Sequence, residues 1–271
     1  MTPQFSKVRP AAVAGRFYPS HPLELRRLIT SLLQNCPPPS GPPPKALIAP
    51  HAGYIYSGPI AASAYAQWAP ARESTSRVLL LGPSHFVGFR GLSASSADAF
   101  ATPLGLVAVD VDAVQRSCSL SQVRVLDEAH AMEHALEVQL PFLQIVLGEF
   151  KLVPLVVGEA DAEEIAKVLE LFWNEPQTRF VISSDLSHYL AAEEARGLDR
   201  ETAAAIEALD ADGVGEEQAC GRLPIRGLLR AASRAGLAAR TLDLRNSGDT
   251  AGPKDRVVGY GAFAFQENRK G

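Results

Sequence analysis

The chain has 271 residues, and its 46% hydrophobic and 21% charged residues are typical of a folded globular protein rather than a disordered one. A net charge of −4, with no run of basic residues, gives no basic surface for nucleic acid or for an anionic membrane. Without a secretory signal or an apolar run of about 18 residues, the sequence predicts a cytoplasmic protein that does not span a membrane.

Apolar and amphipathic segments alternate along the chain. An amphipathic helix is expected over about 22–34, and the run CPPPSGPPPK that follows is interpreted as a stiff connector, because proline disrupts helices and sheet interiors. Buried strands are predicted at 46–50, 78–82, 152–158 and 180–184, helices at 58–67, 129–146, 161–173, 199–209 and 225–235, and final strands at 241–245 and 257–265. This order predicts one α/β domain over residues 1–271, with helices on both faces of its sheet.

Polar residues follow three predicted strands at the points where the strands end. His51 follows ALIAP, and His85 follows VLLLGPS. FVISSD ends on Asp185, with His188 shortly after it. Ligands of open α/β sheets bind at the carboxyl ends of the strands, so we expect His51, His85 and His188 to share one pocket. One such histidine would more often be a structural hydrogen-bonding group, whereas three in the same topological position favour a functional site.

The predicted helix at 129–146 carries a polar face. Helical spacing places His130, His134 and Glu137 together on it. Such a face can supply a metal ligand or a carboxylate that orients one, or it can simply be solvated. Solvation is the expectation for His130 and Glu133, whereas both interpretations stay open for His134 and Glu137.

Two aromatic residues are candidates for contacting an aromatic or planar substrate. They are Tyr54, in the turn after His51, and Phe17, near the amino end of the chain. Either one could instead belong to the core, and for Phe17 the core is the favoured interpretation. Tyr56 is expected to pack on the sheet.

A late polar turn and three cysteines complete the candidates. The turn NSGDT at 246–250 follows a predicted strand, and its carboxylate could join two histidines in the facial triad of non-haem Fe(II) sites. Cys36, Cys118 and Cys220 form no C-x-x-C pair and are expected to be reduced thiols.

Eight ordered motifs resemble the Memo family, designated AmmeMemoRadiSam system protein B in prokaryotes. The motifs are RPAAVAGRFYP, IAPHAGYIYSGPIAA, LLLGPSHF, ATPLG, EHALEVQLPFLQ, VPLVVG, ISSDLSHY and NSGDT…VVGYGAF. They extend from about Arg9 to Phe265. The resemblance implies a fold like that of the class III extradiol ring-cleaving dioxygenases, with a mixed, largely parallel central sheet flanked by helices.

The resemblance also implies a metal held by His51 and His85. Animal members have a cysteine as third ligand, which the resemblance places in the late turn, where this chain has Thr250 beside Asp249. Asp249 would restore the carboxylate of the dioxygenases, and Cys220 lies too early in the chain to be an obvious substitute.

The remaining family motifs imply roles around the same cleft. His188 matches the acid/base histidine of the dioxygenases, and Asp185 is expected to orient it. His134 and Glu137 match the helix that lines the cleft, with Thr250 also expected there.

Four functions are compatible with these residues. The first is an Fe(II)-dependent oxidoreductase, with copper or zinc as other metals, and the second is metal-assisted hydrolysis or lyase chemistry. The third is a module that binds phosphorylated peptides, disfavoured because only Arg16 and Arg90 lie near the cleft motifs. The fourth, implied by the family, is a pathway with an AMMECR1-like partner and a radical SAM protein, acting on a modified macromolecule or a small molecule.

Overall fold

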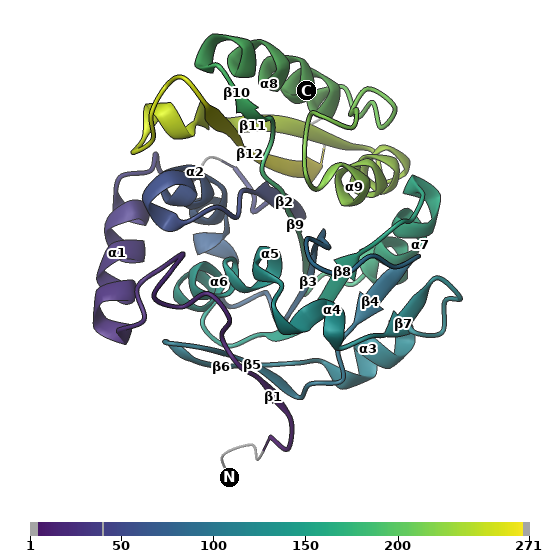
Figure 1. Ribbon diagram of the computed structural model, residues 1–271. Coiled ribbons are helices and arrows are strands. Elements are labelled where there is room, and N and C mark those ends of the chain that lie inside the picture. The colour runs from purple at the N-terminus through teal and green to yellow at the C-terminus, as the bar shows by residue number, and fades with distance from the viewer. Residues whose placement is uncertain (1–4, 40, 268–271) are drawn as a thin grey trace.

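A mixed sheet of nine strands organises the protein, whose computed structural model describes residues 5–39 and 41–267 (Figure 1). Its centre consists of β2 (Ala46–Ala49), β9 (Thr178–Ser183), β3 (Arg77–Pro83) and β8 (Lys151–Val157), which lie in that spatial order. All four run parallel to one another. Their carboxyl ends therefore meet at one edge of the sheet.

The strands on either side of this centre make the sheet mixed. On one side, β12 (Val257–Glu267) pairs antiparallel with β2, and both β11 (Leu237–Asn246) and β10 (His188–Leu190) pair antiparallel with β12. On the other side, β4 (Leu92–Ala94) pairs antiparallel with β8 and parallel with β7 (Val123–Val125). The mixed α/β fold expected from the sequence is confirmed.

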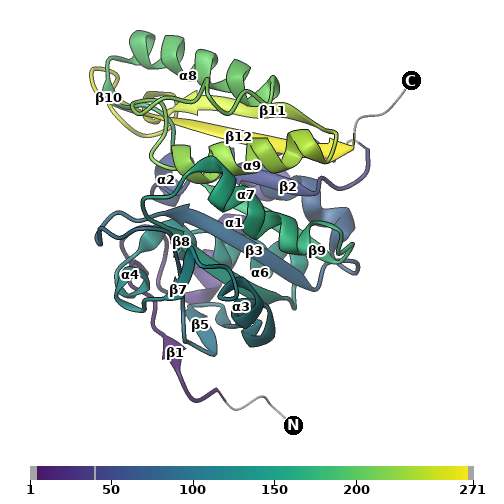
Figure 2. The same ribbon diagram turned by 90° about the vertical axis from the view of Figure 1, so that its right-hand side faces the viewer.

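Helices cover both faces of the sheet (Figures 1 and 2). On one side, α7 (Ala162–Trp173) and α9 (Arg222–Arg234) pack on β3 and β9, and on the other, α2 (Tyr54–Tyr65) packs on β2 and β12 with α1 (Pro22–Gln34) outside it. A further helix, α8 (Ala192–Glu207), packs on β11 and β12. This cover explains why residues 78–81 of β3 are apolar without alternation: none has exposed surface.

Short elements complete the described chain. The helices are α3 (Val111–Ser117), α4 (Glu128–Ala131), α5 (His134–Glu137), α6 (Leu140–Leu147) and the 3-10 turns η1 (Ala66–Ala71) and η2 (Ser247–Asp249). A separate three-stranded sheet contains β1 (Val8–Arg9), β5 (Ala99–Thr102) and β6 (Gly105–Ala108). Within residues 5–39 and 41–267, no helix is both long and apolar enough to cross a bilayer.

The prediction of one helix at 129–146 is wrong, and the difference changes where the polar side chains of this segment lie. The chain leaves the helical conformation at Glu133, which is extended with φ −72° and ψ 124° and separates α4 from α5, and α6 is a further separate helix. The Glu133 side chain caps α5 by accepting a hydrogen bond from the N–H of Ala135. His130 and His134 therefore do not share a helix face.

Two other helices begin a full turn or more earlier than expected. The first, α2, starts at Tyr54 rather than near residue 58, and α8 starts at Ala192 rather than near residue 199. The early turns of α8 are polar, and the acidic side chains of Glu193 and Glu194 in its first turn are favourable at the positive end of the helix dipole. The strands β4 to β7 have only three or four residues each, too few for a periodic pattern.

The close packing of α9 on α7 gives the first testable prediction. A Cβ at Gly227 of α9 would lie 2.5 Å from Cβ of Ile165 on α7, so the helices would have to separate. We expect Gly227→Ala to lower the free energy of unfolding by about 1–3 kcal/mol, measured by urea denaturation. The matched control is Gly197→Ala in α8, where the added Cβ meets no atom within 4 Å and should raise stability by up to about 1 kcal/mol. Equal effects at the two positions would contradict the packing argument.

Candidate metal centre

A cleft of about 690 Å³ lies at the carboxyl ends of the central strands. The polar side chains that line it include Arg16, His51, Tyr56, His85, His134, Asp185, His188, Tyr189, Cys220, Ser247 and Tyr260. His51 follows β2, His85 follows β3 and Asp185 follows β9, while His188 begins β10. The structure thus brings His51, His85 and His188 to one cleft, as their positions after the strands indicate.

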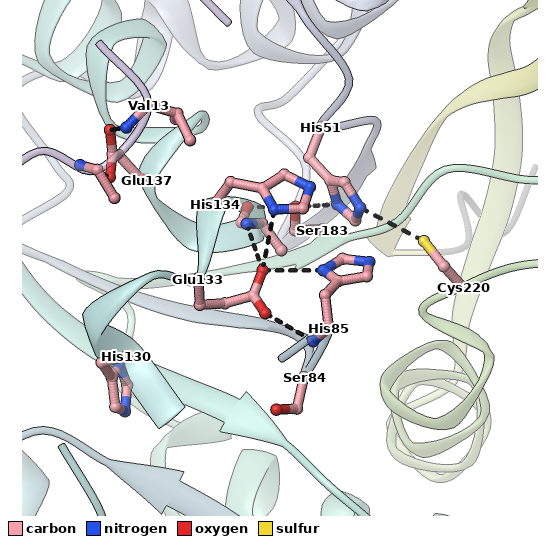
Figure 3. A network of polar contacts seen from close by, with 12 residues as sticks. Val13, His51, Ser84, His85, His130, Glu133, His134, Glu137, Ser183 and Cys220 are labelled. Carbon is pink, nitrogen blue, oxygen red and sulfur yellow. Dashed lines mark hydrogen bonds and ion pairs between the residues drawn. The ribbon is translucent and has the colours of Figure 1, made fainter. Parts of the chain in front are cut away.

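Three imidazoles in this cleft converge on one point (Figure 3). His51, His85 and His134 each offer a nitrogen, and these nitrogens all lie within 4.8 Å of one another. The ring centroids of His85 and His134 are 4.6 Å apart, and those of His51 and His85 are 5.2 Å apart. Such spacing suits the coordination of one divalent ion by three nitrogens.

The hydrogen bonds of His51 fix its tautomer. The Ser183 hydroxyl donates to the carbonyl of Ala135 at 2.6 Å, so it can only accept from other groups. It accepts from the Gln139 amide at 2.7 Å, and Nδ1 of His51 lies 2.8 Å from it. His51 therefore carries its proton on Nδ1, which leaves the lone pair of Nε2 directed into the cleft.

The carboxylate of Glu133 orients His85 in the same way. Nδ1 of His85 donates to Oε1 of Glu133 at 2.9 Å, and the backbone N–H of His85 donates to Oε2 at 2.7 Å. Nδ1 of His134 lies 3.5 Å from the same Oε1 (Figure 3). Solvation of Glu133 was the expectation from the sequence, and it is wrong: the residue is only 2% exposed. A carboxylate behind a ligating imidazole is the usual outer partner of a metal ligand.

The charges in the cleft favour a cation. Burial lowers the pKa of His51 to about 3 and that of His134 to about 4, so both rings are neutral at pH 7. Burial alone would raise the pKa of Glu133, but its hydrogen bonds with His85 and Ala135 bring the pKa down to about 2, and it is ionised. Neutral nitrogen donors beside a carboxylate are the electrostatic setting that a metal ion requires.

Cys220 is the functional candidate that the sequence argument passed over. It lies just before α9, and its Sγ is 3.4 Å from Nε2 of His51 (Figure 3). Gly221 permits this approach, because a Cβ there would lie 2.6 Å from Cβ of Ser184, and its N–H donates to the Ser184 hydroxyl. Burial, together with the nearby Asp185 carboxylate, raises the pKa of the thiol to about 12. The Cys-Gly pair at a helix start is the local pattern that could have indicated it.

Asp185 lines the cleft and is buried. Its Oδ1 accepts a hydrogen bond from the backbone N–H of His51 at 2.7 Å, which ties the ends of β9 and β2 together. Burial raises the pKa of Asp185. The sequence predicts that it orients His188, whereas the hydrogen bond found here is to His51.

Asp249 and Thr250 lie in η2 and just after it, and neither lines the cleft. Oδ1 of Asp249 accepts from Arg196 at 2.6 Å, and Oδ2 accepts from the N–H of Asn246 at 3.0 Å. The Thr250 hydroxyl donates to the carbonyl of Ser247. The expectation that Asp249 is the third ligand is therefore corrected: its carboxylate closes its own turn and pairs with Arg196, and His134 takes its place among the converging groups.

Glu137 is likewise turned away from the cleft (Figure 3). Its buried carboxylate accepts from the N–H groups of Ala12 and Val13, from the hydroxyl of Tyr18 and from the guanidinium of Arg9. It thus anchors the segment before α1, and the expectation that it lines the cleft is wrong. This anchoring holds Phe17, whose ring lies 4.8 Å from that of His134 and which does line the cleft.

The positions of Tyr54 and Tyr56 are the reverse of the expected ones. Tyr54 is buried, with its hydroxyl donating to the carbonyl of Val138, whereas Tyr56 is partly exposed and lines the cleft. Tyr54 opens α2 with its ring toward the core, and two residues further along the helix face another direction. His130 is also buried elsewhere, with Nε2 3.0 Å from the carbonyl of Ser93, and is not solvated as expected.

Comparison with known proteins gives consistent similarities. The family model "Memo-like protein" matches residues 9–264. Proteins named "MEMO1 family protein" are similar over nearly their whole lengths: the one from Aquifex aeolicus is 37% identical over 96% of this chain and 99% of its own. The one from Aeropyrum pernix is 39% identical over 94% and 99%. A crystal structure of an uncharacterized protein from Escherichia coli K12 superposes with a TM-score of 0.50 at 14% identity, covering 79% of this chain and 98% of that one, and shows similarity of fold alone.

Burial of neutral histidines predicts a loss of stability in acid. The pKa of His51 is lowered to about 3, and those of His130 and His134 to about 4, in each case chiefly by burial. Unfolded histidines take up protons near pH 6.5, so between about pH 6.5 and 4 the unfolded chain binds protons that the folded chain excludes. The free energy of unfolding should then fall as the pH falls, by up to about 1 kcal/mol per pH unit for each of these histidines.

Urea denaturation of the EDTA-treated protein at about pH 7, 6 and 5 measures this slope. In His130→Gln, where the amide can still donate to Ser93, the loss on acidification should shrink by about one third, since one of three histidines is removed. The exposed His21 provides the control, and His21→Gln should leave the slope unchanged. An identical slope in His130→Gln and the unmodified protein would refute the assignment.

Proposed function

The chain belongs to the Memo-like family, and from the site geometry we propose that it is a metal-dependent oxidoreductase that uses a non-haem iron ion. The observation that carries the proposal is the arrangement of His51 and His85. The Nδ1 atom of each ring is hydrogen-bonded to a protein group, and the two rings each offer a nitrogen to the three-histidine cluster. An imidazole held in this way is prepared to bind a metal through its other nitrogen.

The donors present fit a transition metal. His51, His85 and His134 would supply three nitrogens, and the Cys220 thiol, 3.4 Å from Nε2 of His51, would supply a sulfur. Imidazole and thiolate ligands suit iron, copper and zinc rather than magnesium or calcium, whose preferred ligands are oxygens. Bound iron would supply the electron-transfer and oxygen chemistry that amino-acid side chains lack.

The surrounding side chains have separate tasks in this proposal. His188 lines the cleft outside the three-histidine cluster, so it can give a proton to a substrate or accept one from it. Asp185 holds the backbone of His51 in place and so maintains the distance between β2 and β9. Phe17 and Tyr56 form aromatic walls that would contact a planar substrate.

The likeness to class III extradiol dioxygenases supports oxygen chemistry but remains a prediction. Metal-assisted hydrolysis is the second candidate, because three histidines also hold the zinc ion of hydrolytic and hydrating enzymes. An oxygen electrode separates the two, since turnover without oxygen uptake would favour hydrolysis. Phosphopeptide binding has less support, because Arg16 is the only arginine that lines the cleft among the described residues. An AMMECR1-like partner and a radical SAM protein also remain predictions.

Metal binding by the three histidines is directly testable. We expect anaerobically purified protein to bind close to one equivalent of iron, measured by elemental analysis. Substituting His51, His85 or His134 by alanine should weaken binding by at least the 10–100-fold that is typical for loss of an outer partner. His188→Ala and Asp249→Asn are the controls and should keep the metal, because neither side chain belongs to the cluster. A protein that takes up no transition metal would remove the proposal, and loss of metal in Asp249→Asn would indicate that Asp249 is a ligand, as the sequence predicts.

The role of Cys220 has a spectroscopic test. In protein loaded with Co(II), a thiolate ligand produces a strong charge-transfer band in the near ultraviolet. Burial keeps the Cys220 thiol protonated in the absence of metal, and a bound metal would deprotonate it. Cys220→Ser should abolish this band and retain the weaker bands of the bound cobalt. Cys118→Ser is the matched control, since Cys118 follows α3 and lies outside the cleft. A band that persists in Cys220→Ser would show that the thiol is not a ligand.

A further inference from the structure

A second cavity, of about 800 Å³, lies at the opposite ends of the same central strands. Lys45 directly precedes β2, Arg179 is the second residue of β9, and Gln266 is near the end of the antiparallel β12, and all three line this cavity. The strands run from here to the histidine cleft, so the two sites share no lining residue. Its volume is within the range of small-molecule sites.

Arg179 is an unusual residue in this cavity. It is half-buried, its Nε has no exposed surface, and the atom has no hydrogen-bond partner among the described residues. No ion pair joins Arg179 to a carboxylate in the described chain, and burial lowers its pKa. A buried guanidinium normally has an acceptor, because removing it from water without one is costly.

The neighbouring charges do not compensate Arg179. Lys45 is also cationic, and burial together with the charge of Arg179 lowers the pKa of Lys45 to about 8. Its ammonium donates to the carbonyls of Glu175 and Thr178. The Glu170 carboxylate at the cavity wall is already paired with Arg234, at 2.9 Å, and Glu267 is exposed at the rim. The interior of the cavity therefore holds an excess of positive charge.

Two further features indicate the kind of molecule that would fit. Oε1 of Gln266, another residue of the cavity wall, is also buried and has no hydrogen-bond donor among the described residues, so a second polar group of the wall lacks a partner. Trp173 forms an apolar wall, with its ring stacked on Phe180 at a centroid distance of 4.8 Å. We propose that this cavity binds a small organic oxyanion, a carboxylate or a phosphate ester bearing a hydroxyl or amino group, with the oxyanion on Arg179 and the donor on Gln266.

Calorimetric titration of the purified full-length protein tests the proposal, with inorganic phosphate, glycerol 3-phosphate and lactate as probes. At least one probe should bind with one-to-one stoichiometry, and Arg179→Gln should weaken its binding by about 10-fold or more. Arg26→Gln is the matched control, because Arg26 is an exposed residue of α1 and its loss changes the net charge equally. Binding of the phosphates alone would identify a phosphate ester as the ligand class, and binding of lactate alone a carboxylate.

A measurement on the ligand-free protein separates binding from a structural role. Removal of an uncompensated buried charge should leave the melting temperature of Arg179→Met equal to or higher than that of the unmodified protein. A fall of several degrees would show that Arg179 stabilises the fold and would overturn the proposal. The proposal also fails if no probe binds at about 10 mM, or if Arg179→Gln and Arg26→Gln weaken binding equally. None of these outcomes depends on the metal centre.

Discussion

The in-register parallel pairing of β2, β9 and β3 is the constraint on which the candidate metal centre depends. Ala49 lies opposite Ser183, and Ile182 lies opposite Leu81, so the three strands reach the same edge together. Since side chains alternate between the faces of a strand, a slip of one residue in β9 would turn Ser183 away from His51. The register of the sheet therefore determines the tautomer of a histidine, and through it the atom that can bind a metal.

The strands and their polar ends could be predicted from the sequence because both follow from local patterns. A buried parallel strand is an apolar run, and the rule that ligands bind at carboxyl ends needs only the order of elements. The break before α5 could not be predicted in this way, because neither proline nor glycine marks it. Glu133 leaves the helix to bind His85, and this tertiary contact overrides the helical preference of the segment. Because the helix is broken there, helical spacing predicts a shared helix face that does not exist in the structure.

The identity of the remaining donors depends on loop conformation, which sequence order does not convey. The turn after a strand and the family resemblance both favour Asp249 as a ligand, yet its carboxylate is used by its own turn and by Arg196. The position of Cys220 in the chain argues against it as a ligand, yet the start of α9 lies against the end of β9 where Gly221 contacts Ser184. A short polar side chain in a turn often binds its own backbone, whereas a helix packed on the sheet can bring a distant residue to the cleft.

The two ends of the central sheet carry charged groups of opposite sign. At the carboxyl end, the ionised Glu133 accepts hydrogen bonds from His85 and Ala135, beside the imidazoles of His51 and His134, which burial keeps uncharged. At the amino end, Arg179 has no carboxylate partner within the part of the chain that the structure describes. A guanidinium held partly out of water without an acceptor lowers stability, so the presence of Arg179 is better explained by a ligand than by folding. A cation at the first site and an anion at the second would each interact favourably with the charge at that end, and each would stabilise the central sheet from its own end.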